Sequence, residues 1–335
     1  MRATVIGAGV AGLACATELM KRGAAVTVVE RAPDIGPASC SWWAGGMLAP
    51  WCEGESAEEP VLRLGRRAAD WWEAQAGGVV RRGTLVVAPA RDAGEVKRFA
   101  RRTENFEPLD GTAIDTLEPD LAGRFRSGLL FRDEAHLDPR AATRRLAERL
   151  TAGGAELRFG TEAAEAPESD VIVDCRGLAA RDSLPDLRGV RGEMLVLRSR
   201  EITLTRTIRL LHPRIPLYVV PRGEGLYMLG ATTIESASRS PVSARSLMEL
   251  LSAAYALHPA FGEAEVVEIG VDARPAFPDN LPRAWRDGNR IFVNGLYRHG
   301  FLLAPAMAER AAALAFGAAE TEEENDADRL ERQAL

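Results

Sequence analysis

Apolar residues form two short runs near the start of the chain, each with the length of a buried strand. The first covers residues 3–6, and the second is the segment AVTVVE at 25–30. Between the two runs a helical pattern ends with Lys21, Arg22 and Gly23, and basic residues followed by glycine are typical of a helix C-terminus. This order predicts a strand, a helix and a second strand.

Three glycines occupy the connection between the first strand and this helix. Gly7, Gly9 and Gly12 have the spacing G-x-G-x-x-G, in which the first permits a tight turn, the second lets a pyrophosphate approach the backbone and the third lets the helix pack on the strand. Glu30 ends the second strand, where an acid accepts hydrogen bonds from an adenosine ribose. The pattern predicts a site for FAD or NAD rather than NADP, and a glycine-rich turn with only a structural role is the alternative.

Two later segments have the pattern of strands that return to the same sheet. DVIVDCRGL at 170–178 is an apolar run that ends in polar residues, and RIFVNG at 290–295 is a second run followed by a glycine-containing turn. A long helix is predicted after that turn, from about Leu302 to Phe316. Its positive end would point at whatever lies over the turn, and for a flavin this is the region where negative charge accumulates on reduction.

Alternating segments between these parts predict a second sheet. The runs EMLVLRS at 193–199, RTIRLLH at 206–212, PLYVVP at 216–221 and LYMLGAT at 226–232 have strand character, and RGEG between the last two is a hairpin signal. We therefore expect an α/β protein in which a Rossmann-type dinucleotide-binding domain is joined to a second, mainly antiparallel-sheet domain. A small-molecule site is expected at the interface between the two domains.

Composition and charge narrow the class of protein. The chain has 335 residues, of which 46% are hydrophobic, which is enough for a sizeable core. Residues 318–335 hold seven acids and two arginines, a charge of −5, so the rest of the chain carries only −1 of the net −6 and gives no support for nucleic-acid or membrane binding. Four cysteines without paired metal-type spacing suit a reducing cytoplasm, and we expect a cytoplasmic protein with no signal segment, membrane anchor or metal site.

The segment PASCSWWAGGMLAP at 37–50 changes the prediction about the dinucleotide. Small residues and two glycines alternate with Trp42, Trp43 and Met47, which favours a backbone that passes closely along a large planar group. This pattern favours a flavin over a nicotinamide. Ordinary aromatic packing inside a buried loop is the alternative.

Together these segments resemble the D-amino-acid oxidase family, and within it the glycine oxidases of thiamine biosynthesis. The resemblance covers residues 1 to about 317 and implies tightly but non-covalently bound FAD. It rests on the glycine fingerprint with Glu30 and on AGGMLAP at 44–50, EAHLDPRAATRRL at 134–146, YVVPRGEGLYMLGATT at 218–233, DARPAFPDNLP at 272–282 and YRHGFLLAPAMAE at 297–309.

The resemblance implies a division into domains. Residues 1–65, 135–180 and 285–317 are expected to form the FAD-binding domain. Residues 66–134 and 181–284 are expected to form the substrate-binding domain. The acidic tail at 318–335 falls outside the resemblance.

The resemblance also implies roles for individual residues. Arg274 in DARP would bind the substrate carboxylate, Tyr218 in YVVPR and Arg298 in YRHGF would complete the catalytic site, and Met47 would lie beside the flavin. Because 40 of the 42 basic residues are arginine, a surface role for Arg274 remains open, as does a purely structural role for Tyr218. The residues expected to contact FAD are Gly7, Gly9, Val10, Ala11, Gly12, Glu30, Arg31, Ser41, Gly45, Gly46, Met47, Gly177, Arg298, His299, Gly300, Phe301 and Leu302.

The activity that the resemblance implies is oxidative deamination of glycine to iminoacetate and glyoxylate, with reduction of oxygen to hydrogen peroxide. The product would supply thiazole synthesis for thiamine, with hand-off to thiazole synthase, and a homo-oligomer is expected. Thr233 stands where many glycine oxidases have methionine, and Arg176 in CRG replaces a small apolar residue. An oxidase or dehydrogenase of sarcosine or a small D-amino acid is therefore one alternative, and a non-catalytic dinucleotide-binding protein is another.

Overall fold

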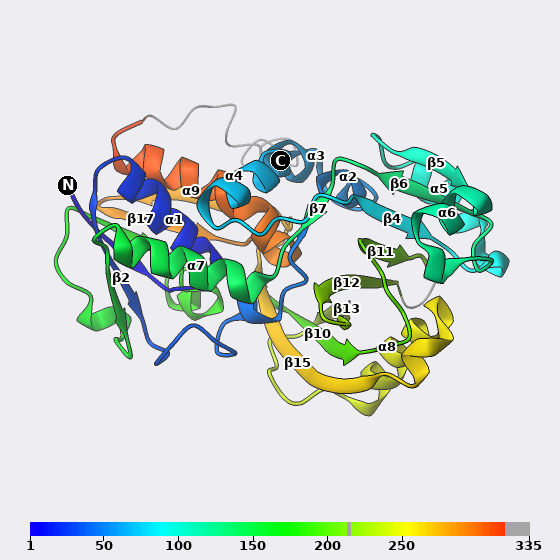
Figure 1. The fold of residues 1–335 in the computed structure, drawn as a ribbon. Coiled ribbons are helices and arrows are strands. Elements are labelled where there is room, and N and C mark those ends of the chain that lie inside the picture. Colours follow the sequence, from blue (N-terminus) through cyan, green and yellow to red (C-terminus); the bar gives the residue numbers. More distant parts are fainter. Residues whose placement is uncertain (213–215, 319–335) are drawn as a thin grey trace.

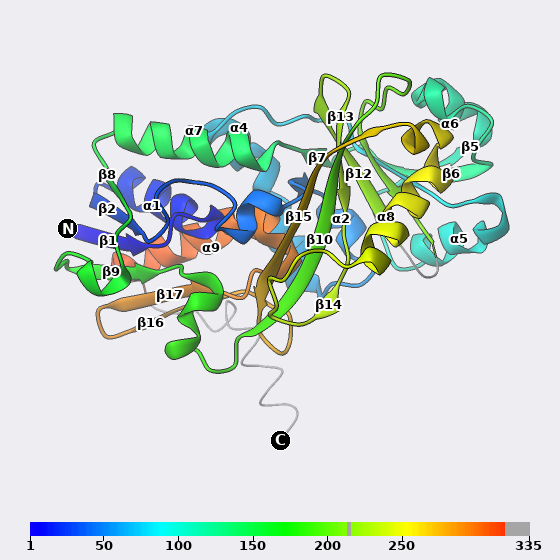
Figure 2. The same cartoon turned by 90° about the horizontal axis from the view of Figure 1, so that it is seen from below.

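Two large β-sheets lie side by side in the computed structural model, which describes residues 1–212 and 216–318 (Figure 1). The N-terminal strands and the last helix belong to one half of the molecule. The long strands β10 and β15 run where the two halves meet (Figure 2). Apart from Ala318, the predicted acidic tail lies outside the described residues.

The first sheet has six strands in the order β16-β17-β9-β1-β2-β8. Five of them are parallel, and β16 is an antiparallel edge strand. Only the first residue of the central β1 is exposed, as expected for a strand covered on both faces. The strands are β1 (Arg2–Ile6), β2 (Ala25–Glu30), β8 (Glu156–Phe159), β9 (Val171–Asp174), β16 (Arg283–Asp287) and β17 (Arg290–Asn294).

Four helices share an apolar core with this sheet. The helix after β1 packs against two of the others, and its alanine and glycine positions permit close approach. Asp138 begins one helix by accepting hydrogen bonds from the N–H groups of Arg140 (2.8 Å) and Ala141 (3.1 Å), with Pro139 in the first position. The four helices are α1 (Val10–Lys21), α4 (Ala68–Gln75), α7 (Pro139–Ala152) and α9 (Gly300–Ala315).

The second sheet has nine strands in the order β14-β10-β13-β12-β11-β4-β6-β5, with β15 paired to β10. All its pairs are antiparallel except β4 with β11. The predicted hairpin is β12–β13, whose turn places Glu224 and Gly225 at φ 52° and 70°. The strands are β4 (Thr84–Val87), β5 (Glu107–Asp110), β6 (Ser127–Phe131), β10 (Arg188–Arg198), β11 (Thr207–Leu210), β12 (Leu217–Gly223), β13 (Leu226–Gly230), β14 (Ile234–Glu235) and β15 (Glu265–Ala276).

Short elements complete the fold. The strands β3 (Met47–Leu48) and β7 (Ala135–His136) form a two-stranded sheet, and α2 (Pro50–Glu53) and α3 (Glu59–Gly65) follow β3. The helices α5 (Gly94–Ala100), α6 (Gly111–Leu117) and α8 (Ala244–Leu257) pack on the second sheet. In the described part of the chain, none of the helices has the length and apolar character needed to cross a bilayer.

The expected fold class is confirmed, with a Rossmann-type parallel sheet joined to a mainly antiparallel one. The final helix differs from the prediction in its start. It begins at Gly300 rather than at about Leu302, directly after a single turn of 3₁₀ helix at Tyr297–His299. Its N-terminus therefore lies closer to Arg298 and His299 than the sequence pattern indicated.

The packing of helix α4 concerns the predicted boundary between the two domains at residues 65 and 66. The domain boundaries remain predictions. Helix α4 lies within the segment 66–134 that was expected in the second domain, but Trp71 and Trp72 belong to the core of the first sheet. The indole Nε1 of Trp72 donates a hydrogen bond to the carbonyl oxygen of Phe301 at 2.7 Å. We propose that the first domain extends through α4.

The Trp72 hydrogen bond predicts a stability effect. Residue 305 would normally donate its N–H to the Phe301 carbonyl in α9, but it is Pro305, which has no N–H. The Trp72→Phe variant therefore leaves this buried carbonyl without its donor, and we expect the free energy of unfolding to fall by about 1–3 kcal/mol. Denaturant unfolding followed by circular dichroism measures it, and an unchanged value would show that Trp72 does not supply this bond.

Candidate active site

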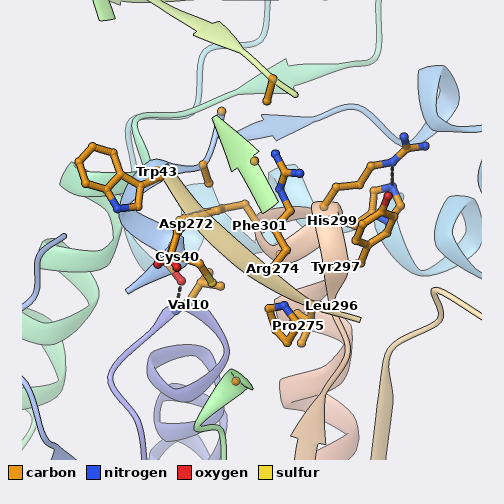
Figure 3. Close-up of a pocket in the computed structure, with 18 of the residues that line it drawn as sticks. Val10, Cys40, Trp43, Asp272, Arg274, Pro275, Leu296, Tyr297, His299 and Phe301 are labelled. Atoms are coloured by element: carbon orange, nitrogen blue, oxygen red, sulfur yellow. Dashed lines mark hydrogen bonds between the residues drawn. The ribbon is translucent and has the colours of Figure 1, made fainter. Parts of the chain in front are cut away.

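One cavity of about 680 Å³ lies between the two sheets. Its floor is formed where the parallel strands β1, β2 and β9 end and where α1 and α9 begin, and its roof is formed by β10, β11, β12 and β15 of the second sheet. Figure 3 shows that residues from both halves point into it. The carboxyl ends of parallel strands are the usual ligand-binding edge of such a sheet.

The turn after β1 has the features of a phosphate cradle. Gly7 has a φ of 103°, and Gly9 precedes α1 without offering a side chain to the free N–H groups of the helix. A Cβ atom at Gly9 would lie 3.3 Å from the hydroxyl oxygens of Ser39 and Ser41. The Ser41 Oγ also accepts a hydrogen bond from the Val10 N–H at 3.0 Å. A helix N-terminus open in this way favours an anion.

Glu30 borders the cavity beside this cradle. Its carboxylate accepts hydrogen bonds from the N–H of Ala8 (2.8 Å) and the N–H of Ala32 (2.9 Å). Two backbone donors therefore fix its position. The remaining lone pairs are available to a hydroxyl-bearing ligand.

The residues predicted to contact the cofactor all line this cavity except Gly12. A Cβ atom at Gly12 would overlap the carbonyl oxygen of Gly7, so this glycine lets α1 pack closely on the turn. The roles of the lining residues stay predictions. The lining members are Gly7, Gly9, Val10, Ala11, Glu30, Arg31, Ser41, Gly45, Gly46, Met47, Gly177, Arg298, His299, Gly300, Phe301 and Leu302.

A buried carboxylate, Glu53 of α2, holds the start of α9. The Nε2 of His299 lies 2.9 Å from Glu53 Oε2, and the Nη2 of Arg298 lies 3.2 Å from the same oxygen. The other oxygen, Oε1, lies 3.3 Å from Nη1 of Arg209 on the roof strand β11. Glu53 therefore connects the floor of the cavity with its roof.

The charges of this cluster do not cancel. Burial alone would raise the pKa of Glu53, but Arg209, Arg298 and the hydrogen bond from His299 hold it well below its usual range. Burial lowers the pKa of His299, so the ring is neutral near pH 7. One carboxylate and two guanidinium groups leave a net positive charge, which adds to the positive end of α9.

Arg274 and Tyr218 project from the roof. Arg274 on β15 donates from Nη1 to the carbonyl oxygen of Thr232 at 3.3 Å, and its guanidinium covers Gly192 of β10, where a Cβ atom would collide with it. The ring of Tyr218 would lie 2.9 Å from a Cβ atom at Gly45. Burial raises the pKa of Tyr218, so its hydroxyl keeps a proton to donate.

Arg222 ties the roof to the glycine segment at 44–46. Its Nη2 donates to the carbonyl oxygens of Gly45 (2.8 Å) and Ala44 (3.3 Å), and its Nη1 donates to that of Leu137. Burial lowers the pKa of Arg222 to about 10, so it remains charged at neutral pH. Strand β12 therefore fixes the path of the segment that the sequence places beside a flavin.

Met47 and two further positions noted in the sequence, Thr233 and Arg176, line the cavity. Met47 lies in β3 and Thr233 follows β13. Arg176 forms ion pairs with Asp174 (2.9 Å) and Asp182 (2.8 Å). These two carboxylates balance its charge, so Arg176 adds little positive potential to the cavity.

Sequence reasoning missed Glu53, Arg209 and Arg222. The chain has 40 arginines, so a single arginine does not stand out in the sequence, and Glu53 belongs to no motif. One signal was available for Arg209, because it interrupts the apolar run at 207–211 with a charge. Among the described residues, no group of His, Cys, Asp and Glu is arranged to hold a metal ion.

The cavity fits a flavin dinucleotide. The cradle at Gly9, the carboxylate of Glu30 and the N-terminus of α9 line a single space. Residues 2–314 match the DAO family, described as FAD dependent oxidoreductase. The chain belongs to this family. FAD is therefore its cofactor, and the protein is an oxidoreductase.

Individual relatives of this DAO-family chain cover most of its length. It is 60% identical, over 309 residues, to a Rhizobium etli protein named for the thiamine biosynthesis oxidoreductase ThiO, covering 92% of this chain and 94% of the relative. It is 28% identical to the "Bifunctional protein ThiO/ThiG" of Nostoc, with 91% of this chain covered but only 51% of the relative, so it spans about half of that protein. The crystal structure of glycine oxidase from Bacillus cereus has the same fold, with a TM-score of 0.83 at 23% identity and coverage of 97% and 99%.

A second buried carboxyl group, Glu134, lies next to α2. Its Oε1 accepts a hydrogen bond from the N–H of Cys52 at 2.7 Å, and its Oε2 has no hydrogen-bond partner among the described residues. Burial raises the pKa of Glu134 from 4.5 to about 7. Ionising this group in the folded protein is therefore costly.

Glu134 predicts a pH dependence of stability. Because its folded pKa lies above its unfolded value, the protein is most stable below about pH 4.5 with respect to this group and loses that contribution as the pH rises through about 7. The Glu134→Gln variant cannot ionise, so its melting temperature should fall less than that of the wild type between about pH 5 and about pH 8. Calorimetry on both, with exposed Asp133→Asn as control, makes the measurement. Parallel pH profiles for the two proteins would refute the role of Glu134.

Proposed function

We propose that this protein oxidises glycine with FAD, releasing the imine that hydrolyses to glyoxylate and ammonia and passing the electrons to oxygen. The observation that carries the proposal is the placement of Arg274 in the roof of the flavin cavity, beside Tyr218. A guanidinium fork and a protonated hydroxyl are suited to bind an amino-acid carboxylate. The relatives named as a ThiO oxidoreductase and as glycine oxidase support the choice of substrate.

The chain's own residues orient the substrate rather than react with it. When bound, FAD accepts the hydride from the substrate's α-carbon. Arg274 binds the carboxylate, Tyr218 donates a hydrogen bond to it, and the walls of the cavity exclude water so that the neutral amine is favoured. The positive charge left by Glu53, Arg209 and Arg298 favours the build-up of negative charge during the reaction.

Thr233 gives a reason to test larger substrates as well. Thr233 lines the cavity three residues after the end of β13, where a longer residue would occupy more of the space. Sarcosine and D-alanine differ from glycine by one methyl group, and a methyl group is worth only about 1–3 kcal/mol of discrimination in a pocket. Preference for glycine therefore depends on the shape of this wall.

The place of the reaction in metabolism is also proposed from the relatives. In the Nostoc protein, a ThiO part and a ThiG part share one chain. We propose that this protein likewise passes its imine product to a thiazole synthase, which in this case is a separate partner protein. We also propose that the protein forms a homo-oligomer and that oxygen accepts the electrons from the reduced flavin.

Anaerobic mixing of the purified holoprotein with glycine, sarcosine or D-alanine tests the function. Any compound that reacts should remove the visible absorbance of the oxidised flavin. We expect the loss to be fastest with glycine. Faster loss with sarcosine or D-alanine would transfer the function to that substrate. If glycine leaves the absorbance unchanged, glycine oxidation is excluded.

Arg274→Ala predicts a specific kinetic change. Loss of a desolvated charge pair costs several kcal/mol, so the KM for glycine should rise by about 100-fold or more while FAD stays bound. Arg274→Lys keeps the charge but loses the fork and should raise KM less. Arg198→Ala at the end of β10 is the control, since Arg198 forms a solvent-accessible ion pair with Glu265 at 3.2 Å and does not line the cavity. A KM equal to that of the wild type would remove Arg274 from the substrate site.

A further inference from the structure

The segment at 231–243, which joins β13 to α8, is held firmly to the roof. The buried Arg191 donates to the carbonyl oxygens of Ser238 (3.0 Å) and Pro241 (2.9 Å). The same guanidinium is paired with Glu193, with Nη2 2.6 Å from Oε1. These contacts fix the backbone on both sides of residue 239.

Between these two contacts, Arg239 reaches across to Asp272 on β15. Its Nε lies 2.6 Å from Asp272 Oδ1, and its Nη2 donates to Oδ2 at 3.3 Å. The carboxylate of Asp272 is buried, whereas 48% of the Arg239 side chain is exposed. Asp272 lies two residues before Arg274, so both side chains project from the same face of β15.

Asp272 lies at the phosphate end of the cavity. Figure 3 shows it beside Cys40 and close to Val10, the first residue of α1. Burial, and then the charge of Asp272, raise the pKa of the Cys40 thiol to about 12. A carboxylate therefore stands next to the cradle at Gly9, where the fingerprint places the pyrophosphate of the dinucleotide.

Such a carboxylate would repel a pyrophosphate unless a cation lay between them. Arg239 meets this requirement. A guanidinium has five N–H donors, and the pair with Asp272 uses two of them. Among the described residues no acceptor is recorded for the other three donors, and Arg239 lines the cavity, where they can bind a second anion.

We propose that Arg239 is a cofactor-binding residue contributed by the roof, whose guanidinium bridges Asp272 and the pyrophosphate of FAD. The segment fixed by Arg191 thereby becomes part of the cofactor site, although the residues of the cradle described above come from the segments that follow β1 and β2. The inference depends on FAD as the cofactor and is independent of glycine as the substrate.

The role of Arg239 is tested by the dissociation constant of the complex between FAD and the apoprotein. This constant is measured by flavin fluorescence at low and at high salt. Arg239→Gln should raise the constant by about tenfold or more, because it removes a charge-assisted contact and leaves Asp272 unpaired beside the pyrophosphate. Asp272→Asn should bind FAD at least as tightly as the wild type. The double variant should recover part of the loss, and its constant should depend less on salt than that of the wild type.

The exposed Arg245→Gln on α8 is the matched control, and it should bind FAD as the wild type does. Wild-type affinity in Arg239→Gln, or a double variant that binds no better than Arg239→Gln, would overturn the proposal. If Arg239→Gln does not fold, Arg239→Lys replaces it, since it keeps the charge but not the two-pronged geometry. Arg239→Lys should then show a smaller loss, and an unchanged constant would again overturn the proposal.

Discussion

The buried carboxylate of Glu53 is the interaction on which the site depends most. One of its oxygens faces His299 and Arg298 at the start of α9, and the other faces Arg209 of the roof. Without this charge, the Arg209 and Arg298 guanidinium groups would lose the carboxylate with which both form ion pairs, and Arg209 is the more buried of the two. The active cavity of this oxidoreductase is therefore formed around an ion cluster that belongs to both sheets.

Further contacts fix the parts of the floor and of the roof, and one of them joins the two. Arg222 binds the carbonyl oxygens of the glycine segment, Trp72 supplies the donor that Pro305 lacks, and Arg191 holds the segment that carries Arg239. Each contact joins segments far apart in the sequence. A flavin and a small amino acid can be held in reacting geometry only if the two sheets do not move against each other, because misplacement by about 1 Å is costly for catalysis.

The parts of this structure that the sequence predicted are those governed by local backbone requirements. The glycine fingerprint needs a tight turn and an open helix N-terminus, and Glu224 with Gly225 needs positive φ, so short segments carry the information. The cluster around Glu53 could not be predicted in this way, since Arg209 lies 156 residues away and is one of 40 arginines. The packing of Trp72 of α4 against Phe301 could not be predicted in this way either, since 229 residues separate the two in the sequence.

The most direct test of this account is the Glu53→Gln variant, compared with Glu58→Gln at an exposed position of the same region. FAD retention and thermal unfolding should be measured on both proteins. If Glu53 holds the two sheets and the start of α9 together, Glu53→Gln should lower the melting temperature by several degrees and release FAD more readily, while Glu58→Gln should match the wild type. A Glu53→Gln protein with wild-type melting temperature and FAD affinity would contradict the central role of this carboxylate.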